Sequence, residues 1–204
     1  MSKLGILNYE VGNLKSIKNA MDYCGFNYVI SSDVKELQAC ERLIIPGVGA
    51  FGTGIQNLKK HGLDHLLAES FKLEKPMLGI CLGYQLMCHS STEFGMNEGL
   101  NFIPADVREI KAPILPHIGW STLQSVSPSL ESTLYNGVDN RQFYFVHTFA
   151  VTLSDQVKEH CSVTQYYDER FASSARIKNA FGVQFHPEKS SEQGLAVLRN
   201  FYNF

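Results

Sequence analysis

Short apolar runs alternate with amphipathic segments through the first half of the chain, and this alternation limits the possible folds more than any other feature. The apolar runs, which are typical of buried strands, are Leu4–Asn8, Tyr28–Ser31, Arg42–Ile45 and Met77–Ile80. The helical patterns are Leu14–Cys24 (which Asn13 can cap and Gly25 can end), Ile55–Lys60, Leu63–Phe71 and Leu82–Ser90. Strands that alternate with helices are joined by right-handed crossovers and pair in parallel. The pattern therefore predicts an α/β fold of three layers, in which an open and largely parallel sheet lies between helices.

The second half has a different pattern, which predicts antiparallel or mixed strands. From about Phe102 to Phe185, short β-like runs are separated by Pro, Gly, Asn and Asp. Examples are Val107–Ile110, Phe143–Phe149, Cys161–Tyr166 and Phe181–Phe185. The final segment, Gln193–Tyr202, predicts an amphipathic helix with Leu195, Leu198, Phe201 and Tyr202 facing inward. No repeat or linker interrupts the sequence, so we expect residues 1–204 to form a single domain.

Composition excludes several functional classes. The chain is 44% hydrophobic, and its formal net charge of -2 is spread along the sequence. We expect no nucleic-acid partner and no membrane binding, because the sequence has neither a basic patch nor an apolar run of about 18 residues. Five irregularly spaced cysteines, without a Cys-x-x-Cys pair, argue against a disulfide framework or a zinc site and favour a reducing cytoplasm. We expect no metal and no cofactor.

The segment Gly79-Ile80-Cys81-Leu82-Gly83 lies where a predicted strand turns into a helix. Its spacing matches the nucleophile elbow, Gly-x-nucleophile-x-Gly, with cysteine in place of serine. Side chains two residues before and after the nucleophile would collide with their neighbours in so sharp a turn, and glycine removes that collision. Cys81 would lie at a helix N-terminus, where the helix dipole favours the reactive thiolate. The alternative is an inert buried cysteine in a tight turn.

A nucleophilic thiol needs a base, and the base needs a group that orients it. His186 follows an apolar run and precedes Pro187, and Glu188 lies within reach of its imidazole. Cys81, His186 and Glu188 are therefore a candidate triad, although a strand-end histidine beside a surface glutamate would give the same pattern. The other histidines considered suit this role less well: His61 and His65 share a solvated helix face with Asp64, His89 follows Cys81 too closely on the same helix, and His160 lies in a polar loop.

Together, GICLGYQ and VQFHPEKS resemble the two signatures of the class I, triad-type, glutamine amidotransferases. The loop Pro46–Phe51 is similar to the family's glycine-rich loop, which supplies a backbone N–H to the oxyanion hole. The resemblance covers nearly the whole chain, and the motifs occur in the family's order. It implies the fold of that class, with glutamine as the substrate and with hydrolysis to glutamate and ammonia as the reaction.

The resemblance also implies roles for individual residues. Cys81 would attack the side-chain amide of glutamine and form a γ-glutamyl thioester. His186 would carry the thiol proton to the leaving ammonia, and Glu188 would orient His186. The backbone N–H groups of Gly49 and Leu82 would hold the oxyanion, which lowers the barrier. The residues implied for binding the α-amino and α-carboxylate end of glutamine are Gln85, Glu93, Thr148 and Phe149.

Within the family, four segments are most similar to the glutaminase subunits of imidazole glycerol phosphate synthases: Gly12–Ser16, Pro116–Trp120, Tyr144–Thr148 and His186–Ser190. This similarity implies transfer of ammonia to a separate (β/α)8-barrel cyclase or synthase subunit, which makes imidazole glycerol phosphate and AICAR in histidine biosynthesis. It also implies low activity without the partner, if the oxyanion donor points away until the interface repositions it. The residues expected on the partner surface are Asn13, Pro116, His117, Trp120 and Lys189.

Other interpretations stay open. The family's first loop usually reads Tyr-Gly-x-Gly-Asn, whereas this chain has Glu10 after Tyr9. That difference slightly favours a paralogous glutaminase subunit that supplies ammonia to a synthase amidating surface-polysaccharide sugars. A cysteine peptidase of the same broad fold, or a non-catalytic subunit, agrees less well with the motifs. An alternative for Trp120, less favoured than the interface, is a core anchor, and an alternative for His147 is a strand histidine with satisfied hydrogen bonds.

Overall fold

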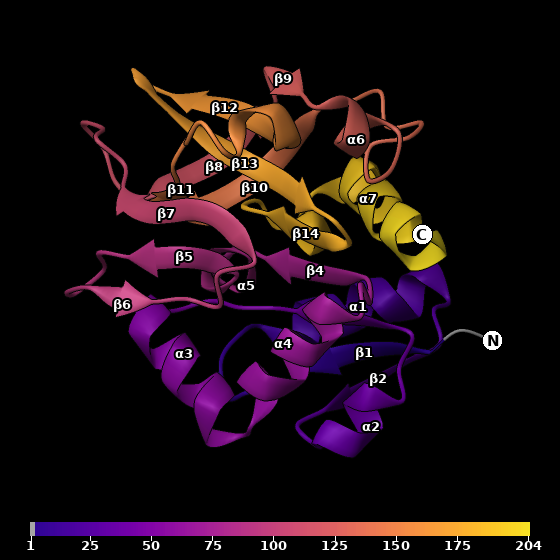
Figure 1. The fold of residues 1–204 in the computed structure, drawn as a ribbon. Coiled ribbons are helices and arrows are strands. Elements are labelled where there is room, and N and C mark those ends of the chain that lie inside the picture. Colours follow the sequence, from indigo (N-terminus) through magenta and orange to yellow (C-terminus); the bar gives the residue numbers. More distant parts are fainter. Residues whose placement is uncertain (1–2) are drawn as a thin grey trace.

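The computed structural model describes residues 3–204, and its centre is an eight-stranded sheet of order β2-β1-β3-β4-β14-β13-β12-β9 (Figure 1). The parallel strands are β1 (Leu4–Leu7), β2 (Tyr28–Ser31), β3 (Arg42–Ile45), β4 (Met77–Ile80) and β14 (Ala180–Val183). Antiparallel strands extend the sheet: β13 (Glu169–Ile177), β12 (Cys161–Tyr166) and β9 (Ser125–Val126). The predicted α/β class, with a parallel first half and a mixed second half, is confirmed.

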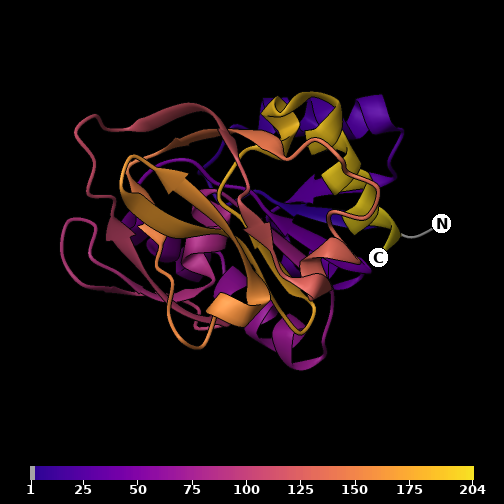
Figure 2. The same cartoon turned by 90° about the horizontal axis from the view of Figure 1, so that it is seen from above.

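Helices cover both faces of this sheet. On one face α1 (Leu14–Cys24) packs against α7 (Ser191–Asn203), seen in Figure 2 as an indigo helix beside the yellow one. The other face is covered by α2 (Val34–Gln38), α3 (Phe51–Lys60) and α4 (Leu63–Lys72). Successive strand residues point to opposite faces, so Ile6 packs in the apolar cluster on the side of α1 and α7, whereas Leu7 packs in the cluster on the side of α2, α3 and α4.

Two smaller sheets pack against the antiparallel half. One pairs β8 (His117–Thr122) with β10 (Gln142–His147), and the other has β11 (Phe149–Val151), β7 (Ile103–Glu109), β5 (Cys88–Ser91) and β6 (Asn97–Glu98) in that order. The strand expected over Phe143–Phe149 is therefore two strands. It divides at Thr148, because pairing with β8 ends at His147 and pairing with β7 starts at Phe149.

The helix expected over Leu82–Ser90 is shorter than predicted. α5 spans Leu82–Leu86, and β5 starts at Cys88. The carbonyl groups of residues 86–88 accept hydrogen bonds from the amides of residues 100–103, so they cannot continue the helix. A Cβ on Gly99 would lie 2.1 Å from the Cys88 carbonyl oxygen, so this close approach requires glycine. His89 consequently lies on a strand and not on the expected helix.

The other predicted helices are confirmed: α1 has the predicted bounds, whereas α3, α4 and α7 have shifted ends. Asn13 caps α1 by accepting from the Ser16 N–H at 3.4 Å, and Gly25 ends it with φ +68°. α3 starts at Phe51, four residues before the expected start. The sequence patterns missed α2, the strands β5, β6, β8, β9 and β13, and the short helices α6 (Pro128–Glu131), η1 (Lys158–His160) and η2 (Pro187–Lys189).

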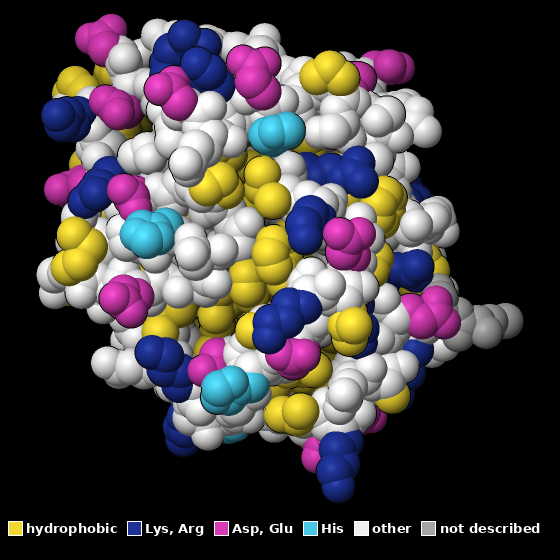
Figure 3. All heavy atoms as spheres, in the orientation of Figure 1, with side chains coloured by type: hydrophobic (Ala, Val, Ile, Leu, Met, Phe, Trp, Pro, Cys, Tyr) yellow, Lys and Arg dark blue, Asp and Glu magenta, His cyan; other side chains and the backbone are white. Residues whose placement is uncertain are grey.

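Charged side chains of both signs are interspersed on the face shown in Figure 3. Within residues 3–204, no helix has the length and apolar character needed to cross a membrane. The same residues contain no cluster of three or more His, Cys, Asp or Glu side chains placed to hold a metal ion.

Candidate active site

The turn between β4 and α5 has the geometry that its glycines allow. Cys81 adopts φ +52° and ψ -107°, which L-residues rarely do. A Cβ on Gly83 would lie 1.8 Å from the Ile45 carbonyl oxygen, and a Cβ on Gly79 would lie 2.7 Å from the backbone of Gly83. Both distances are shorter than any van der Waals contact, so the steric reason predicted for the two glycines is confirmed.

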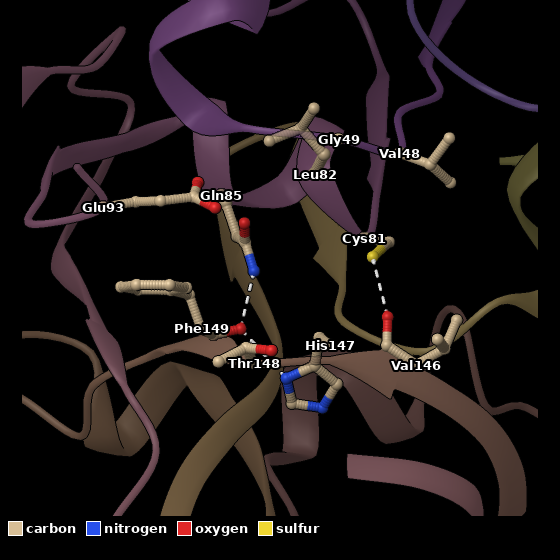
Figure 4. Close-up of a pocket in the computed structure, with 10 residues that line it drawn as sticks. All are labelled: Val48, Gly49, Cys81, Leu82, Gln85, Glu93, Val146, His147, Thr148 and Phe149. Atoms are coloured by element: carbon tan, nitrogen blue, oxygen red, sulfur yellow. Dashed lines mark hydrogen bonds between the residues drawn. The ribbon is translucent and has the colours of Figure 1, made fainter. Parts of the chain in front are cut away.

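The Cys81 side chain lies at the wall of a cavity (Figure 4). Its Sγ is 3.9 Å from the Val146 carbonyl oxygen, to which the thiol donates. The side-chain Nε2 of Gln184 donates to Sγ from 3.6 Å. The backbone N–H of Cys81 donates to the Val183 carbonyl at 2.8 Å, which fixes the turn against β14.

His186 and Glu188 form a buried pair beside this thiol. His186 Nδ1 lies 2.8 Å from Glu188 Oε1, and both side chains are 2% exposed. Burial disfavours the imidazolium, but Cys81 and Glu188 outweigh burial and raise the pKa of His186. His186 Nε2 is buried and has no hydrogen-bond partner among residues 3–204, so it is free to exchange a proton. The structure thus brings the three predicted triad residues together.

The cavity has a volume of about 280 Å³, close to the lower end of small-molecule sites. It is lined by every residue predicted to hold the oxyanion or the amino-acid end of glutamine: Gly49, Leu82, Gln85, Glu93, Thr148 and Phe149. Val48, Val146 and His147 complete the wall together with Cys81. A cavity of this size suits a small molecule.

Two side chains give the cavity acceptors for a positively charged group. The Gln85 amide donates through Nε2 to the Phe149 carbonyl at 2.8 Å and to Gln184 Oε1 at 3.1 Å. Its own Oε1 is therefore the atom left for a ligand. Glu93 accepts from the Phe51 N–H at 2.7 Å through Oε2, at the start of α3. The other carboxylate oxygen stays free to accept, and an ammonium group matches this pair of acceptors.

The loop after β3 holds one of the two predicted oxyanion donors in another hydrogen bond. The Leu82 N–H donates to the Gly47 carbonyl at 3.4 Å, a long bond. Gly49 has φ +118°, a conformation that favours glycine. The Tyr9 hydroxyl donates to the Pro46 carbonyl and so anchors the start of the loop. The Leu82 N–H becomes available to a ligand only when its bond to Gly47 breaks.

The segment from Tyr144 to Phe149 contacts the site through its backbone carbonyls. The Tyr144 oxygen accepts from the His186 N–H at 2.9 Å. The Val146 oxygen accepts from Cys81, and the Phe149 oxygen accepts from Gln85. One stretch of chain therefore positions the candidate base, the nucleophile and a substrate-binding residue.

Two buried histidines continue this network away from the cavity. His147 Nδ1 lies 2.9 Å from the Phe149 carbonyl, which can only accept, so Nδ1 carries the proton. His147 Nε2 then accepts from His117 Nδ1 at 3.1 Å, and His117 Nε2 accepts from the Ser121 hydroxyl at 2.8 Å. Burial lowers the pKa of His117 to about 4 and that of His147 to about 3, so both are neutral. The alternative of a satisfied strand histidine is confirmed for His147, whereas nothing in the sequence suggested its pairing with His117.

The residues expected on the partner surface differ in exposure. Those exposed are Asn13, Pro116, Trp120 and Lys189. His117 is 1% exposed and faces the interior. Trp120 is 49% exposed, so the alternative of a core anchor is wrong. Its ring meets the Tyr144 ring edge-on at 6.2 Å, and Lys189 Nζ lies 6.0 Å from the centre of that same ring. The structure thus adds Tyr144 to this surface.

Glu10, which stands where the family usually has glycine, keeps a glycine-like backbone conformation and forms ion pairs with its side chain. It has φ +64°, a conformation that glycine adopts without strain. Its exposed carboxylate binds Lys60 at 2.8 Å and His61 at 3.2 Å at the end of α3. His61 is therefore a partner of Glu10 at the C-terminal end of α3, whereas His65 lies in α4, so the prediction that the two histidines share one helix face is wrong.

This chain is similar to known proteins in sequence and in fold. The family model described as glutamine amidotransferase class-I matches residues 6–203. The Chlorobium luteolum protein named imidazole glycerol phosphate synthase subunit HisH is 40% identical over 96% of this chain and 97% of that protein. The Arabidopsis thaliana imidazole glycerol phosphate synthase hisHF, chloroplastic, is 41% identical over 98% of this chain, which spans only 34% of the plant protein. A crystal structure described as a glutamine amidotransferase superposes with a TM-score of 0.74 at 16% identity, over 98% of this chain and 97% of that one.

Proposed function

This chain belongs to the class-I glutamine amidotransferase family, and on that premise we propose that it is the glutaminase subunit of an imidazole glycerol phosphate synthase, an enzyme of histidine biosynthesis. The observation that carries the proposal is Cys81 at the wall of a cavity of amino-acid size, with the buried pair of His186 and Glu188 beside its thiol. Relatives of nearly equal length and 39% to 40% identity bear that name. The reaction is hydrolysis of glutamine to glutamate and ammonia, and we propose that it uses no cofactor.

The acylation half follows from the site geometry. His186 Nε2 takes the proton of the Cys81 thiol, and Sγ attacks the side-chain carbonyl carbon of glutamine. The carbonyl oxygen becomes an oxyanion, which the N–H groups of Gly49 and Leu82 stabilise. The C–N bond then breaks, and His186 gives its proton to the leaving group, which departs as ammonia. Glu188 orients the imidazole and stabilises its charged form.

In the second half, water hydrolyses the γ-glutamyl thioester and glutamate leaves. The free oxygens of Gln85 and Glu93 bind the α-amino group throughout, and the backbone at Thr148 and Phe149 completes the binding of this end. The lining of the cavity by these residues supports their assignment.

We propose that ammonia passes to a separate (β/α)8-barrel cyclase subunit. Tryptophan and tyrosine are enriched at protein interfaces, which supports the exposed Trp120 and the half-buried Tyr144 as part of the contact surface, with Lys189 beside them. The plant relative, of which this chain matches about a third, supports a synthase partner, because its name designates a whole synthase.

The lone subunit should be a weak glutaminase. Its Leu82 N–H is engaged by Gly47, so the oxyanion hole lacks one donor until the loop moves. Loss of one such donor typically lowers kcat by about 100- to 1,000-fold.

We also propose that residues 1–204 act as one domain in the cytoplasm. Limited proteolysis would test the single domain, and cell fractionation would test the location.

The test measures glutamate release from glutamine by the chain alone, and then with an imidazole glycerol phosphate synthase cyclase and its phosphoribulosyl-aminoimidazole substrate. Cys81→Ala is the control in each mixture. A large increase confined to the full mixture and lost in Cys81→Ala supports the proposal. Hydrolysis that depends on Cys81 and ignores the cyclase would instead favour the sugar-modifying partner. Absence of hydrolysis in every mixture would refute the proposed histidine-pathway function.

A further inference from the structure

Gln184 is a buried polar residue that the mechanism above leaves without a role. It follows β14 directly and is 0% exposed. Its backbone N–H donates to the Ser173 carbonyl at 2.8 Å, so its main chain is held in the sheet. The preceding residue, Val183, is the one that binds the Cys81 N–H. The side chain of Gln184 is thereby placed beside the nucleophile.

Its neighbours decide which end of the Gln184 amide faces the thiol. Nε2 of Gln85 contacts both the Phe149 carbonyl and Gln184, at 2.8 Å and 3.1 Å. A carbonyl oxygen can only accept, so Gln85 must present its NH2 group to Phe149 and, from the same atom, to Gln184. Gln184 must therefore turn Oε1 toward Gln85. Its Nε2 is left facing Cys81 Sγ at 3.6 Å.

The two polar neighbours of Sγ favour opposite protonation states. The Val146 carbonyl accepts from the neutral thiol at 3.9 Å, but it repels a thiolate. The Gln184 N–H is a weak partner for a neutral sulfur and a strong one for an anion, because hydrogen bonds to charged groups are about twice as strong. Once His186 removes the proton, the Gln184 contact gains strength as the Val146 contact is lost.

We propose that Gln184 is a further catalytic residue, which stabilises the Cys81 sulfur through its side-chain N–H whenever that atom carries negative charge. The inference rests on the proposed function, because the thiolate in question is the nucleophile assigned there. Gln184 belongs to the sequence motif around His186, but its position two residues before His186 did not predict a function for it.

The contact acts in both halves of the reaction. In acylation the S–H bond breaks, His186 takes the proton and Sγ keeps the electron pair with which it attacks. In deacylation the attacking water gives a proton to His186, its oxygen bonds to the carbonyl carbon, and the C–S bond breaks with the electron pair returning to Sγ. The charge appears each time on the atom that faces Gln184 Nε2.

The test follows the alkylation of Cys81 by iodoacetamide as a function of pH, with the Cys81 peptide quantified by mass spectrometry. Gln184→Met replaces the amide with an apolar chain of similar shape. Gln184→Glu keeps an acceptor for Gln85 but places an oxygen where the N–H donor was. Ser173→Ala is the matched control, because it removes another fully buried polar group, from the neighbouring strand, that does not contact Sγ.

We expect the midpoint of alkylation to rise by about one to two pH units in Gln184→Met and by more in Gln184→Glu. Ser173→Ala should keep the wild-type midpoint even if its thermal stability falls. Midpoints within experimental error of wild type in both Gln184 variants would overturn the proposal and leave Gln184 a structural residue. The assay needs neither glutamine nor a partner, so its result does not depend on whether the glutaminase proposal holds.

Discussion

Lowering the pH from about 8 to about 5 should destabilise this protein through His147, which is buried in its neutral form. Its pKa is lowered from 6.5 to about 3, first by burial and then by the neighbouring His117. In the unfolded chain, the same side chain takes up a proton near its ordinary value. Between these two values the unfolded chain binds more protons than the folded protein, so stability is lost as the pH falls.

The size of the effect follows from the proton uptake. At pH 5 the folded His147 is still neutral, while the unfolded one is about 1.5 pH units below its midpoint. At about 1.36 kcal/mol per unit, this difference lowers the free energy of unfolding by about 2 kcal/mol. His186 acts in the opposite direction: its raised pKa gives stability that is complete below 6.5 and is lost at higher pH.

A substitution isolates the contribution of His147. His147→Asn cannot titrate, and its amide can still donate to the Phe149 carbonyl. Urea unfolding of wild type and variant at both pH values gives the change in unfolding free energy for each. The loss on acidification should be about 2 kcal/mol smaller in the variant, and the contribution of His186 cancels in this comparison. Equal losses would show that His147 is not held neutral, and would refute the reasoning.

Two further changes test the turn and the cavity. Gly83→Ala should lower the free energy of unfolding, measured with urea, by more than about 3 kcal/mol, because its Cβ would meet the Ile45 carbonyl at 1.8 Å. The control Gly52→Ala should lower it little, because its Cβ meets only the tip of the Asn97 side chain at 2.9 Å. Equal losses of stability in the two variants would contradict the steric argument. Glu93→Gln should raise KM for glutamine by about tenfold or more, with a smaller effect on kcat, because it replaces the charged carboxylate proposed to bind the α-amino group. An unchanged KM would show that Glu93 does not bind the substrate.

Local sterics made the nucleophile turn predictable from the sequence. The sharp turn at Cys81 needs glycine two residues before and two residues after it, so the five residues Gly79–Gly83 were enough to predict the turn. The pairing of His186 with Glu188 was equally visible, because the two residues are close in the chain. The parallel first half followed in the same way from strands and helices of ordinary length.

Contacts between distant segments were not predictable. The end of α5 depends on residues 100–103, which take over its last carbonyl groups. The network of His117 and His147 depends on the register of β8 against β10, and β8 gave no strand signal. Gln184 is part of the motif around His186, but its role becomes visible only in the structure, where Gln85 and Cys81 lie beside it.

The segment from Tyr144 to Phe149 meets the candidate active site through main-chain oxygen atoms. Every amino acid supplies such an atom, so exchanging side chains here leaves these contacts in place. The number of residues in the segment, in contrast, is constrained. Side chains alternate between the two faces of a strand, so deleting one residue would turn buried side chains toward solvent and exposed ones toward the interior. Scanning mutagenesis would therefore miss these main-chain contacts, which depend on the number of residues between Tyr144 and Phe149 and not on their side chains.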